Sequence, residues 1–171
     1  MSNIGLRRGK VKLEPHNDGW SKSYQTEKQQ LTKTLGHVQI EHVGSTAIPG
    51  MKAKPIIDIA IPLLDLENVT KWIKPLESIG YWDKGKQDEM PERRFFAKGP
   101  ETERTVYLHV VTQAEFDRMT RFRDTLINNM DLRNQYSEIK EDLADKFPNN
   151  RQRYTKGKEQ FIQYVLSKAK F

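Results

Sequence analysis

The stretch from His42 to Ile61, which reads HVGSTAIPGMKAKPIIDIAI, decides the fold of this 171-residue chain. An apolar alternation, Val38 and Ile40, leads into it and predicts a strand that ends near Val43. A Gly-Ser turn and two prolines follow, and the residue before each proline is biased toward extended conformations. The β-branched run that closes the stretch is typical of a strand buried on both faces. The stretch therefore predicts two strands joined by a stiff, extended loop.

The second of these strands carries one carboxylate, Asp58, among isoleucines. An ionised carboxylate in an apolar strand is costly unless it has a strong partner, such as a metal ion, a basic side chain or a ligand. The backbone N–H groups of Gly44 and Ser45 can face an anion, and the glycine allows a close approach. This pattern predicts a phosphate site at the turn and a cation held by Asp58. The alternative is a tight β-turn followed by a buried strand with a hydrogen-bonded aspartate.

The segment from Glu41 to Asp58 resembles the signature of the GrpB-like family, a group of small proteins placed in the nucleotidyltransferase superfamily. The resemblance covers nearly the whole chain, through Val11–Trp20, Arg93–Gly99, Leu108–Val111, Phe122–Asp124, Tyr154, Lys158, Phe161 and Ile162. It implies an α+β fold in which helices cover a nucleotidyltransferase-like mixed β-sheet. It also implies a single domain over residues 1–171, with a C-terminal helical part over 112–171.

Enzymes of that superfamily place two acids two residues apart on one strand, so that both point to the same face and share divalent metal ions. The resemblance puts Asp58 at the first of these positions, but Ala60 stands at the second. A third acid comes from a neighbouring strand, which corresponds here to Thr105–Thr112 with His109 as the inward polar residue. We therefore expect Asp58 and His109 to be the catalytic and metal-binding residues, with a divalent cation such as Mg²⁺. The alternative for His109 is a structural hydrogen-bonding group.

Phosphate binding is expected from the turn and from basic side chains around it. The candidates on the stretch itself are Gly44, Ser45, Thr46 and Lys54. Arg94 and Lys98 share one face of a strand predicted over 93–98, and they could clamp a phosphate through charge and hydrogen bonds. On a surface strand these two side chains would instead be edge charges that discourage aggregation. Weaker candidates of the same kind are Arg121, Arg123 and Lys158.

The composition narrows the classes of protein to which the chain can belong. Hydrophobic residues make up 36% of it, and no run approaches the ~20 apolar residues of a membrane helix. Because the chain contains no cysteine, disulfides, a thiolate nucleophile and cysteine-ligated zinc are excluded. The first residues have no apolar core typical of a signal peptide. We therefore expect a cytoplasmic protein with no membrane partner.

Positive charge gathers at the C-terminal end. The net charge is +6, and six basic residues lie between positions 151 and 170, opposed there only by Glu159. Such an end can attract nucleic acid or a nucleotide phosphate, although a solvated helix face is the commoner arrangement. No zinc-finger spacing or arginine–aromatic repeat accompanies it. Nucleic acid is therefore not expected to be the main ligand.

Periodicity places the remaining elements along the chain. Strands are expected over 38–43, 56–61, 93–98 and 105–112, with shorter ones at 10–14 and 81–82. Helices are expected over 20–35, 66–78, 116–127, 132–143 and 161–166. Asp131 and Thr155 are expected to cap the last two of these helices. The polar segment 83–91 predicts a mobile loop.

The first functional hypothesis is an enzyme that binds a nucleotide or another phosphorylated small molecule with a divalent cation and transfers a nucleotidyl group. The second is a ligand-binding or sensing module, in which catalysis was lost together with the acid at position 60. Family members are sometimes joined to a kinase domain of coenzyme A biosynthesis, which implies a CoA-related ligand by association. A third hypothesis is an RNA-binding accessory protein. The sequence leaves the substrate, the metal and the oligomeric state open.

Overall fold

The computed structural model describes residues 4–87 and 90–169. Its strands are β1 (Leu6–Arg7), β2 (Glu41–Val43), β3 (Ile57–Pro62), β4 (Tyr81–Gln87), β5 (Met90–Lys98), β6 (Glu103–Arg104) and β7 (Val106–Val111). Its α-helices are α1 (Gly19–Leu35), α2 (Ile73–Ser78), α3 (Gln113–Asn128), α4 (Met130–Lys146), α5 (Arg151–Lys156) and α6 (Glu159–Lys168). Two 3₁₀ helices complete it, η1 (Ser45–Ala47) and η2 (Leu66–Trp72). The sheet is thus built by the first two thirds of the chain, and the rest is helical.

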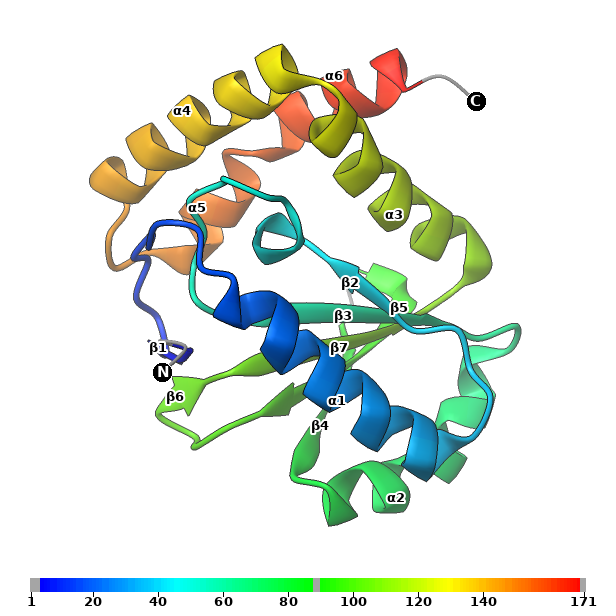
Figure 1. Cartoon of the computed structure of the whole chain (residues 1–171). Helices are drawn as coiled ribbons and strands as arrows, with labels where there is room; N and C mark the ends of the chain where they lie inside the picture. The colour runs from blue at the N-terminus through cyan, green and yellow to red at the C-terminus, as the bar shows by residue number, and fades with distance from the viewer. Residues whose placement is uncertain (1–3, 88–89, 170–171) are drawn as a thin grey trace.

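Five strands form one mixed sheet in the order β2-β3-β7-β5-β4 (Figure 1). Strands β3 and β7 are parallel, and the other neighbours are antiparallel. Strands β1 and β6 form a separate two-stranded sheet. The register places Asp58 beside Tyr107 and Ala60 beside His109. The mixed sheet predicted from four strands is therefore confirmed, with β4 as a fifth strand at its edge.

Helices cover both faces of the sheet. In Figure 1, α1 and α2 lie on one face, and α3 to α6 form an arch over the other. Ile57, Ile59 and Ile61 pack into the main hydrophobic core together with residues of α1 and α2. Because side chains alternate along a strand, Asp58 and Ala60 point to the opposite face, toward the C-terminal helices. The alternation of β3 therefore decides which of its residues reach the helical side.

The loop between β2 and β3 packs against the C-terminal helices. Ile48 and Met51 are buried in a cluster with Leu126 and other residues of α3, α4 and α6. Lys140 of α4 is only 1% exposed, and its ammonium group donates a hydrogen bond to the carbonyl of Lys52. Since the same loop joins two strands of the sheet, it connects the sheet to the helical part.

Two segments differ from the prediction, one near the N-terminus and one at the edge of the sheet. Residues 10–14 form no strand, and Glu14 alone pairs with Ala53 in an isolated bridge. Val11 instead packs against Leu143 and Tyr154 of the C-terminal helices. The apolar alternation of residues 10–14 therefore arises from contact with helices and not from a strand. The segment 83–91, predicted as a loop, belongs to the paired ends of β4 and β5, except for residues 88 and 89, which lie outside the described residues. An edge strand can be polar on its exposed face, and periodicity alone did not detect it.

Helix boundaries also differ in the second half of the chain. The helix predicted over 66–78 is divided into η2 and α2, and Pro75 lies in the first turn of α2, where its missing N–H breaks no helical bond. Asn129, and not Asp131, caps α4, because its side chain accepts from the Leu132 N–H at 3.0 Å. Thr155 lies inside α5 and does not cap α6.

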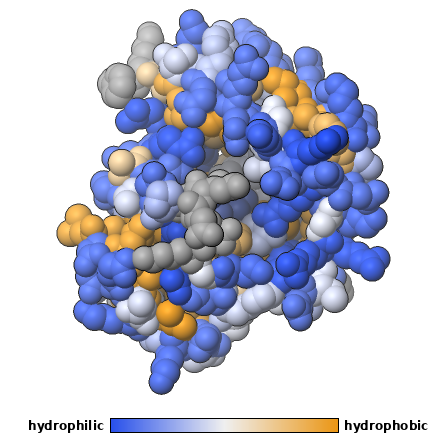
Figure 2. Space-filling model, turned by 180° about the vertical axis from the view of Figure 1, so that it is seen from behind, coloured by the Kyte–Doolittle hydropathy of each residue, from blue (hydrophilic) through white to orange (hydrophobic). Residues whose placement is uncertain are grey.

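The outer surface is mainly polar. Figure 2 shows hydrophilic side chains over most of the face opposite to the view of Figure 1, with hydrophobic groups in separate patches. Within the described part of the chain, residues 4–87 and 90–169, no helix is long and apolar enough to cross a membrane.

The close approach of Gly44 to Asp58 can be tested through stability. Gly44 has φ of 71° and ψ of −174°, and a Cβ there would lie 2.9 Å from Asp58 Oδ2, whereas Gly36, with φ of 81° and ψ of −153°, has nothing within 4 Å of an added Cβ. Both glycines have a backbone conformation that is essentially restricted to glycine, so both Gly→Ala variants incur a similar strain of about 1–3 kcal/mol. We predict that Gly44→Ala lowers the free energy of unfolding by about 2 kcal/mol more than Gly36→Ala in urea denaturation, because it also collides with the carboxylate.

A double variant isolates this contact. Gly44→Ala combined with Asp58→Ala removes the carboxylate that the new methyl group meets. The added cost of Gly44→Ala should then fall close to that of Gly36→Ala. Equal costs of the two single variants would contradict the close approach.

Candidate functional site

A cavity of about 260 Å³ lies between the β2–β3 loop, one face of the sheet and the C-terminal helices. Asp58 of β3 and His109 of β7 lie on its sheet side. Phe122 of α3, Tyr136 of α4 and Tyr154 of α5 line it from the helical side. Because both halves of the chain contribute side chains, the cavity exists only when the helical part is packed on the sheet.

A chain of hydrogen bonds runs along the sheet side of the cavity. His109 Nε2 lies 2.9 Å from Asp58 Oδ1, and Arg93 Nη1 lies 3.3 Å from His109 Nδ1. Arg93 also donates to Glu115 Oε1 of α3 at 2.7 Å. The side chain of His109 is 8% exposed, and that of Asp58 is 31% exposed. Asp58 is therefore the member of this pair that faces the cavity.

The environment determines the charge of each group in this chain. Burial alone would raise the pKa of Asp58, but the hydrogen bond from His109 and the positive charges of Lys54 and Arg151 outweigh it and hold the pKa below its usual value. Burial lowers the pKa of His109 below its usual value, and Arg93 adds to this effect while Asp58 opposes it. At neutral pH the pair is therefore a carboxylate and a neutral imidazole. Since Arg93 can only donate, Nδ1 accepts its hydrogen bond and Nε2 carries the proton that Asp58 accepts.

The Gly44-Ser45 turn lies next to Asp58, as the sequence predicted. A Cβ on Gly44 would lie 2.9 Å from Asp58 Oδ2, so the strand carboxylate packs directly against the backbone of the turn. Ser45 opens η1 and forms a side-chain hydrogen bond with Tyr136 of α4. The turn, the carboxylate and the helical part therefore meet at one point of the cavity.

Thr46 lines the cavity, but its hydroxyl group already has hydrogen-bond partners within the protein. It is 3% exposed, its hydroxyl donates to the carbonyl of Ile56 at 3.4 Å, and His42 Nε2 lies 2.9 Å from the same oxygen. The ring of His42 stacks on Tyr24 of α1 at 4.7 Å between centroids. These contacts hold the β2–β3 loop in place, which is a structural role for Thr46.

Three cationic side chains from three elements converge on the cavity. They are Lys54 from the loop before β3, Arg151 from α5 and Lys158 at the start of α6. The ammonium groups of Lys54 and Lys158 lie over the ring of Tyr154, 5.4 and 4.6 Å from its centroid. Arg151 donates to the hydroxyl of Tyr107 at 2.6 Å. Asp58 is the one carboxylate among the described residues that line the cavity, so positive charge is in excess there.

Burial and mutual repulsion disfavour the protonated lysines. Burial, with the charges of Lys158 and Arg151, lowers the pKa of Lys54 to about 7. Burial lowers the pKa of Lys158 to about 8, with Asp58 opposing the shift and Arg151 adding to it. The free protein therefore holds these ammonium groups in an environment that partly expels their protons.

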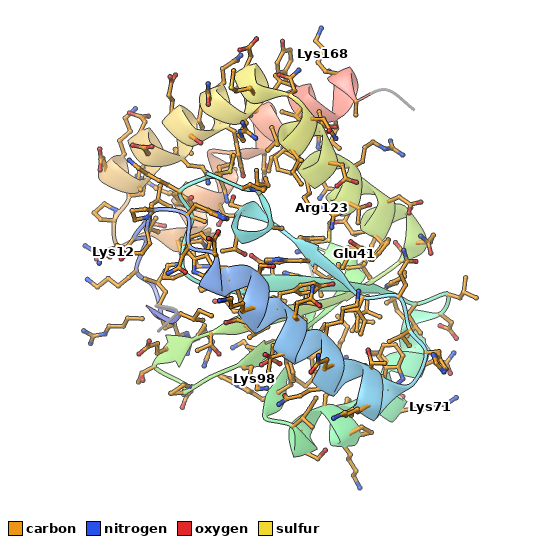
Figure 3. All side chains as sticks on the ribbon, in the orientation of Figure 1. Lys12, Glu41, Lys71, Lys98, Arg123 and Lys168 are labelled. Carbon is orange, nitrogen blue, oxygen red and sulfur yellow. The ribbon has the colours of Figure 1, made fainter. Side chains whose placement is uncertain are left out.

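Arg94 and Lys98 do not reach the cavity. Arg94 Nε donates to Asp83 Oδ1 at 2.9 Å, and Lys98 donates to Glu27 of α1 at 2.9 Å. Figure 3 shows Lys98 on the side of the sheet that α1 covers. The prediction that Arg94 and Lys98 clamp a phosphate is therefore wrong, because both side chains form ion pairs on the face of β5 that lies away from the cavity.

The register of β5 explains this correction. Phe95 lies beside His109, and Arg93 lies beside Val111, so the odd-numbered side chains of β5 share the face of His109. The prediction paired Arg94 with Lys98 correctly on one face but assigned that face to the wrong side of the sheet. Arg93, their neighbour, is the arginine of β5 that lines the cavity.

Two basic residues of the C-terminal end were misinterpreted from the sequence. Arg151 was assigned to a solvated helix face, and Lys158 was only a weak candidate, yet both line the cavity. Tyr154 is 1% exposed, and Arg151 and Lys158 lie three residues before and four residues after it, which is the spacing of one helix face. Arg153 and Lys156 lie off that spacing and are exposed. This periodicity around a buried aromatic is the signal that would have found the two cavity residues.

The residues at Asp58 do not fit the expected metal centre. His109 has partners at both ring nitrogens, and Ala60 offers no donor at the second acid position. Within residues 4–87 and 90–169, no group of three or more His, Cys, Asp or Glu side chains could hold a metal ion. Asp58 is left as a single carboxylate with cationic side chains nearby, whereas Mg²⁺ and Ca²⁺ require several oxygen ligands.

Apart from the residues that line the cavity, the helical part is joined to β2 by a charged contact. Arg123 Nη1 of α3 donates to Glu41 Oε2 and to the carbonyl of His42, both at 2.7 Å. Figure 3 shows Arg123 and Glu41 facing each other from α3 and β2. Arg123, a weak phosphate candidate in the sequence, therefore joins the two halves of the protein.

The fold and the cavity define a small α+β protein in which a strand–turn–strand stretch and C-terminal helices enclose a cationic site. The family model described as GrpB protein matches residues 10–168. A UPF0157 protein of Halalkalibacterium halodurans is 36% identical over 170 residues, 92% of this chain and 86% of that protein. The glutamate-rich protein GrpB of Alkalihalophilus pseudofirmus is 31% identical over 172 residues, 96% of this chain and 98% of that protein. The chain belongs to the GrpB family.

The solved structure of a relative agrees with this assignment. The crystal structure of the conserved protein GrpB from Enterococcus faecalis matches with a TM-score of 0.83 at 29% identity and covers 92% of this chain and 96% of that chain. The Cid1 poly(U) polymerase bound to MgGTP matches with a TM-score of 0.46 at 8% identity, over 75% of this chain and 45% of that chain. A dephospho-CoA kinase of Mycolicibacterium paratuberculosis is 34% identical over 86 residues, 47% of this chain and 21% of that protein. The expected α+β fold is confirmed by the GrpB structure and the observed mixed sheet.

The hydrogen-bond chain predicts the protonation state of His109. We expect a neutral ring protonated at Nε2 at pH 7, because burial and Arg93 disfavour a second proton and Asp58 accepts from Nε2. Long-range ¹H–¹⁵N correlation spectra distinguish the two neutral tautomers and the imidazolium. Asp58→Ala removes the acceptor and should reduce the preference for the Nε2–H tautomer. An imidazolium or an Nδ1–H tautomer in the unmodified protein would contradict the chain.

Proposed function

We propose that this protein binds a phosphorylated small molecule, a nucleotide or a related compound, in the cavity between the sheet and the C-terminal helices. The observation that carries the proposal is the convergence of Lys54, Arg151 and Lys158 on a cavity whose described lining contains one carboxylate. Surplus positive charge in a partly buried site is unfavourable in the free protein. A phosphate anion would offset that charge and favour the protonated lysines.

The cavity also has an apolar side that supports a ligand larger than phosphate. Met119 and Phe122 of α3, Tyr136 of α4 and Ile162 of α6 line it. Small-molecule sites commonly combine apolar walls with a few polar groups that fix the orientation of the ligand. This arrangement supports a ligand with a phosphate at one end and a planar or apolar group at the other. The match to part of a dephospho-CoA kinase adds CoA precursors to the nucleotides as compounds to test, by association.

Nucleotidyl transfer is the second candidate function. The observation that favours it is the ionised Asp58, which packs against the Gly44-Ser45 turn and is 31% exposed to the cavity. A transferase should release pyrophosphate from a nucleoside triphosphate, and Asp58→Ala should abolish this release. Ligand binding without pyrophosphate release would leave the binding function and exclude the transfer. Turnover that survives Asp58→Ala would place the reaction elsewhere.

The lysines provide the direct test of binding. Inorganic pyrophosphate, nucleotides and CoA precursors are titrated into the protein by calorimetry at pH 6.5. A hydrogen bond to a charged group contributes about 1.5–3 kcal/mol. Lys54→Met and Lys158→Met should therefore each weaken binding by roughly 10- to 100-fold.

Lys156→Met is the matched control, because Lys156 belongs to the same C-terminal segment but is exposed outside the cavity. It removes the same charge and should leave the affinity nearly unchanged. An equal loss in the control and in the two cavity variants would indicate general charge attraction and would contradict a site in the cavity.

The lowered lysine pKa values predict opposite pH dependences for binding and stability. Anion affinity should fall from pH 7 to pH 9, as Lys54 and Lys158 lose their protons in the free protein, from pKa values of about 7 and about 8. The free energy of unfolding should rise over the same range, because the unfolded chain still binds protons that the folded lysines have lost. Each such lysine adds up to roughly 1.4 kcal/mol per pH unit.

Several charged and titratable groups around Lys54 contribute to the pH dependence of stability. They are Asp58, Arg151, Tyr154 and Lys158, and buried Lys140, with its pKa lowered to about 7, adds to the slope. Lys54→Met should remove about one lysine's share of the rise in stability measured by urea denaturation. A stability that is flat or falling between pH 7 and pH 9 would contradict the lowered pKa values.

A further inference from the structure

We infer that the cavity binds its phosphate ligand without a divalent cation, with lysine and arginine side chains supplying the positive charge. The inference rests on the proposed function and concerns how the charge of the ligand is neutralised. The resemblance to nucleotidyltransferases implies metal ions held by paired acids. The arrangement around Asp58 departs from that plan in both its donors and its charges.

The donor atoms that a metal ion would need are engaged or absent. His109 directs Nε2 at Asp58 Oδ1, 2.9 Å away, and Nδ1 lies 3.3 Å from Arg93 Nη1. To ligate a metal, the imidazole would have to give up one of these partners. Ala60, which is fully buried, lies beside His109 in the register and brings no oxygen to this face. A divalent cation would therefore meet a single carboxylate that already accepts a hydrogen bond.

Positive charge already surrounds that carboxylate. Lys54, Arg151 and Lys158 each interact electrostatically with Asp58. Below pH 7, where Lys54 and Lys158 keep their protons, three cationic side chains around one carboxylate leave positive charge uncompensated, which suits a phosphate anion. A divalent cation would add to this surplus and be repelled by it. The electrostatics of the site therefore favour an anion and disfavour a metal ion.

The three cationic groups are also held in place before a ligand arrives. Arg151 donates to the Tyr107 hydroxyl at 2.6 Å, and its guanidinium carbon lies 4.7 Å from the centroid of the same ring. The ammonium groups of Lys54 and Lys158 both lie over the ring of Tyr154. Cation–π contacts favour these positions without using up the hydrogen-bond donors of the ammonium groups. Preorganised donors reduce the ordering cost of binding.

Magnesium should therefore compete with the site. In solution Mg²⁺ binds the phosphate oxygens of pyrophosphate and ATP and neutralises the charge that the cavity recognises. Excess Mg²⁺ lowers the concentration of the free anion and weakens apparent binding by mass action. A site that uses a metal ion behaves in the opposite way, because its affinity requires Mg²⁺.

The first experiment is calorimetric titration of inorganic pyrophosphate and of ATP into the full chain at pH 6.5, once with EDTA and once with excess Mg²⁺. We expect binding in EDTA and an apparent affinity about tenfold or more lower in Mg²⁺. Binding that disappears in EDTA and returns with Mg²⁺ would overturn the inference and leave the proposed function intact. The absence of binding under both conditions would overturn the proposed function and the inference with it.

The second experiment is the variant Asp58→Asn in the same titration. The carboxamide keeps an oxygen that can accept from His109, so the fold is retained, but the negative charge is removed. Without a metal ion, the phosphate and Asp58 repel each other, and Asp58→Asn should bind pyrophosphate several-fold more tightly in EDTA. If Asp58 held a metal ion for the ligand, the same variant would bind it more weakly. Far-UV circular dichroism checks that both proteins are folded alike.

Discussion

An ionised carboxylate on a buried strand is the constraint on which the rest of this structure depends. Asp58 lies in β3 between Ile57 and Ile59, which are both fully buried. Its charge is stabilised by the hydrogen bond from His109 of the neighbouring strand and by cationic side chains from the helical part. A charge of this kind cannot be left without partners. The sheet and the C-terminal helices therefore have to meet at Asp58, and the cavity forms where they meet.

The same stretch of chain connects the two halves. Its turn packs against Asp58 through Gly44, and its loop is buried among α3, α4 and α6 through Ile48 and Met51. Lys54, at its end, enters the cavity just before the chain begins β3. One segment of 20 residues thus builds part of the sheet, part of the helical core and one wall of the cavity. A change in this loop is expected to affect folding and ligand binding together.

The sequence predicted these local features well because each of them follows from a short pattern. The turn, the β-branched strand and the inward side chain of His109 depend on alternation within a few residues. The position of Arg94 and Lys98 depends instead on which face of β5 meets the helices, and only the pairing of Phe95 with His109 decides that. The positions of Arg151 and Lys158 depend on how the C-terminal helices pack on the sheet. The sequence therefore predicted the fold and the turn with Asp58, but not the cationic side of the site.

The balance of charges in the cavity also helps to distinguish the two candidate functions, ligand binding and nucleotidyl transfer. A transferase must stabilise charge that develops in the transition state, and binding that is equally strong before and during the reaction does not accelerate it. The cations here are fixed by Tyr107 and Tyr154 in the free protein, and Asp58 is held by His109. Ala60 leaves the second acid position without a donor, so a pair of metal ions has no shared ligands. Under the proposed function, fixed positive charge around a single paired carboxylate suits the binding of a phosphorylated ligand better than the transfer of a nucleotidyl group.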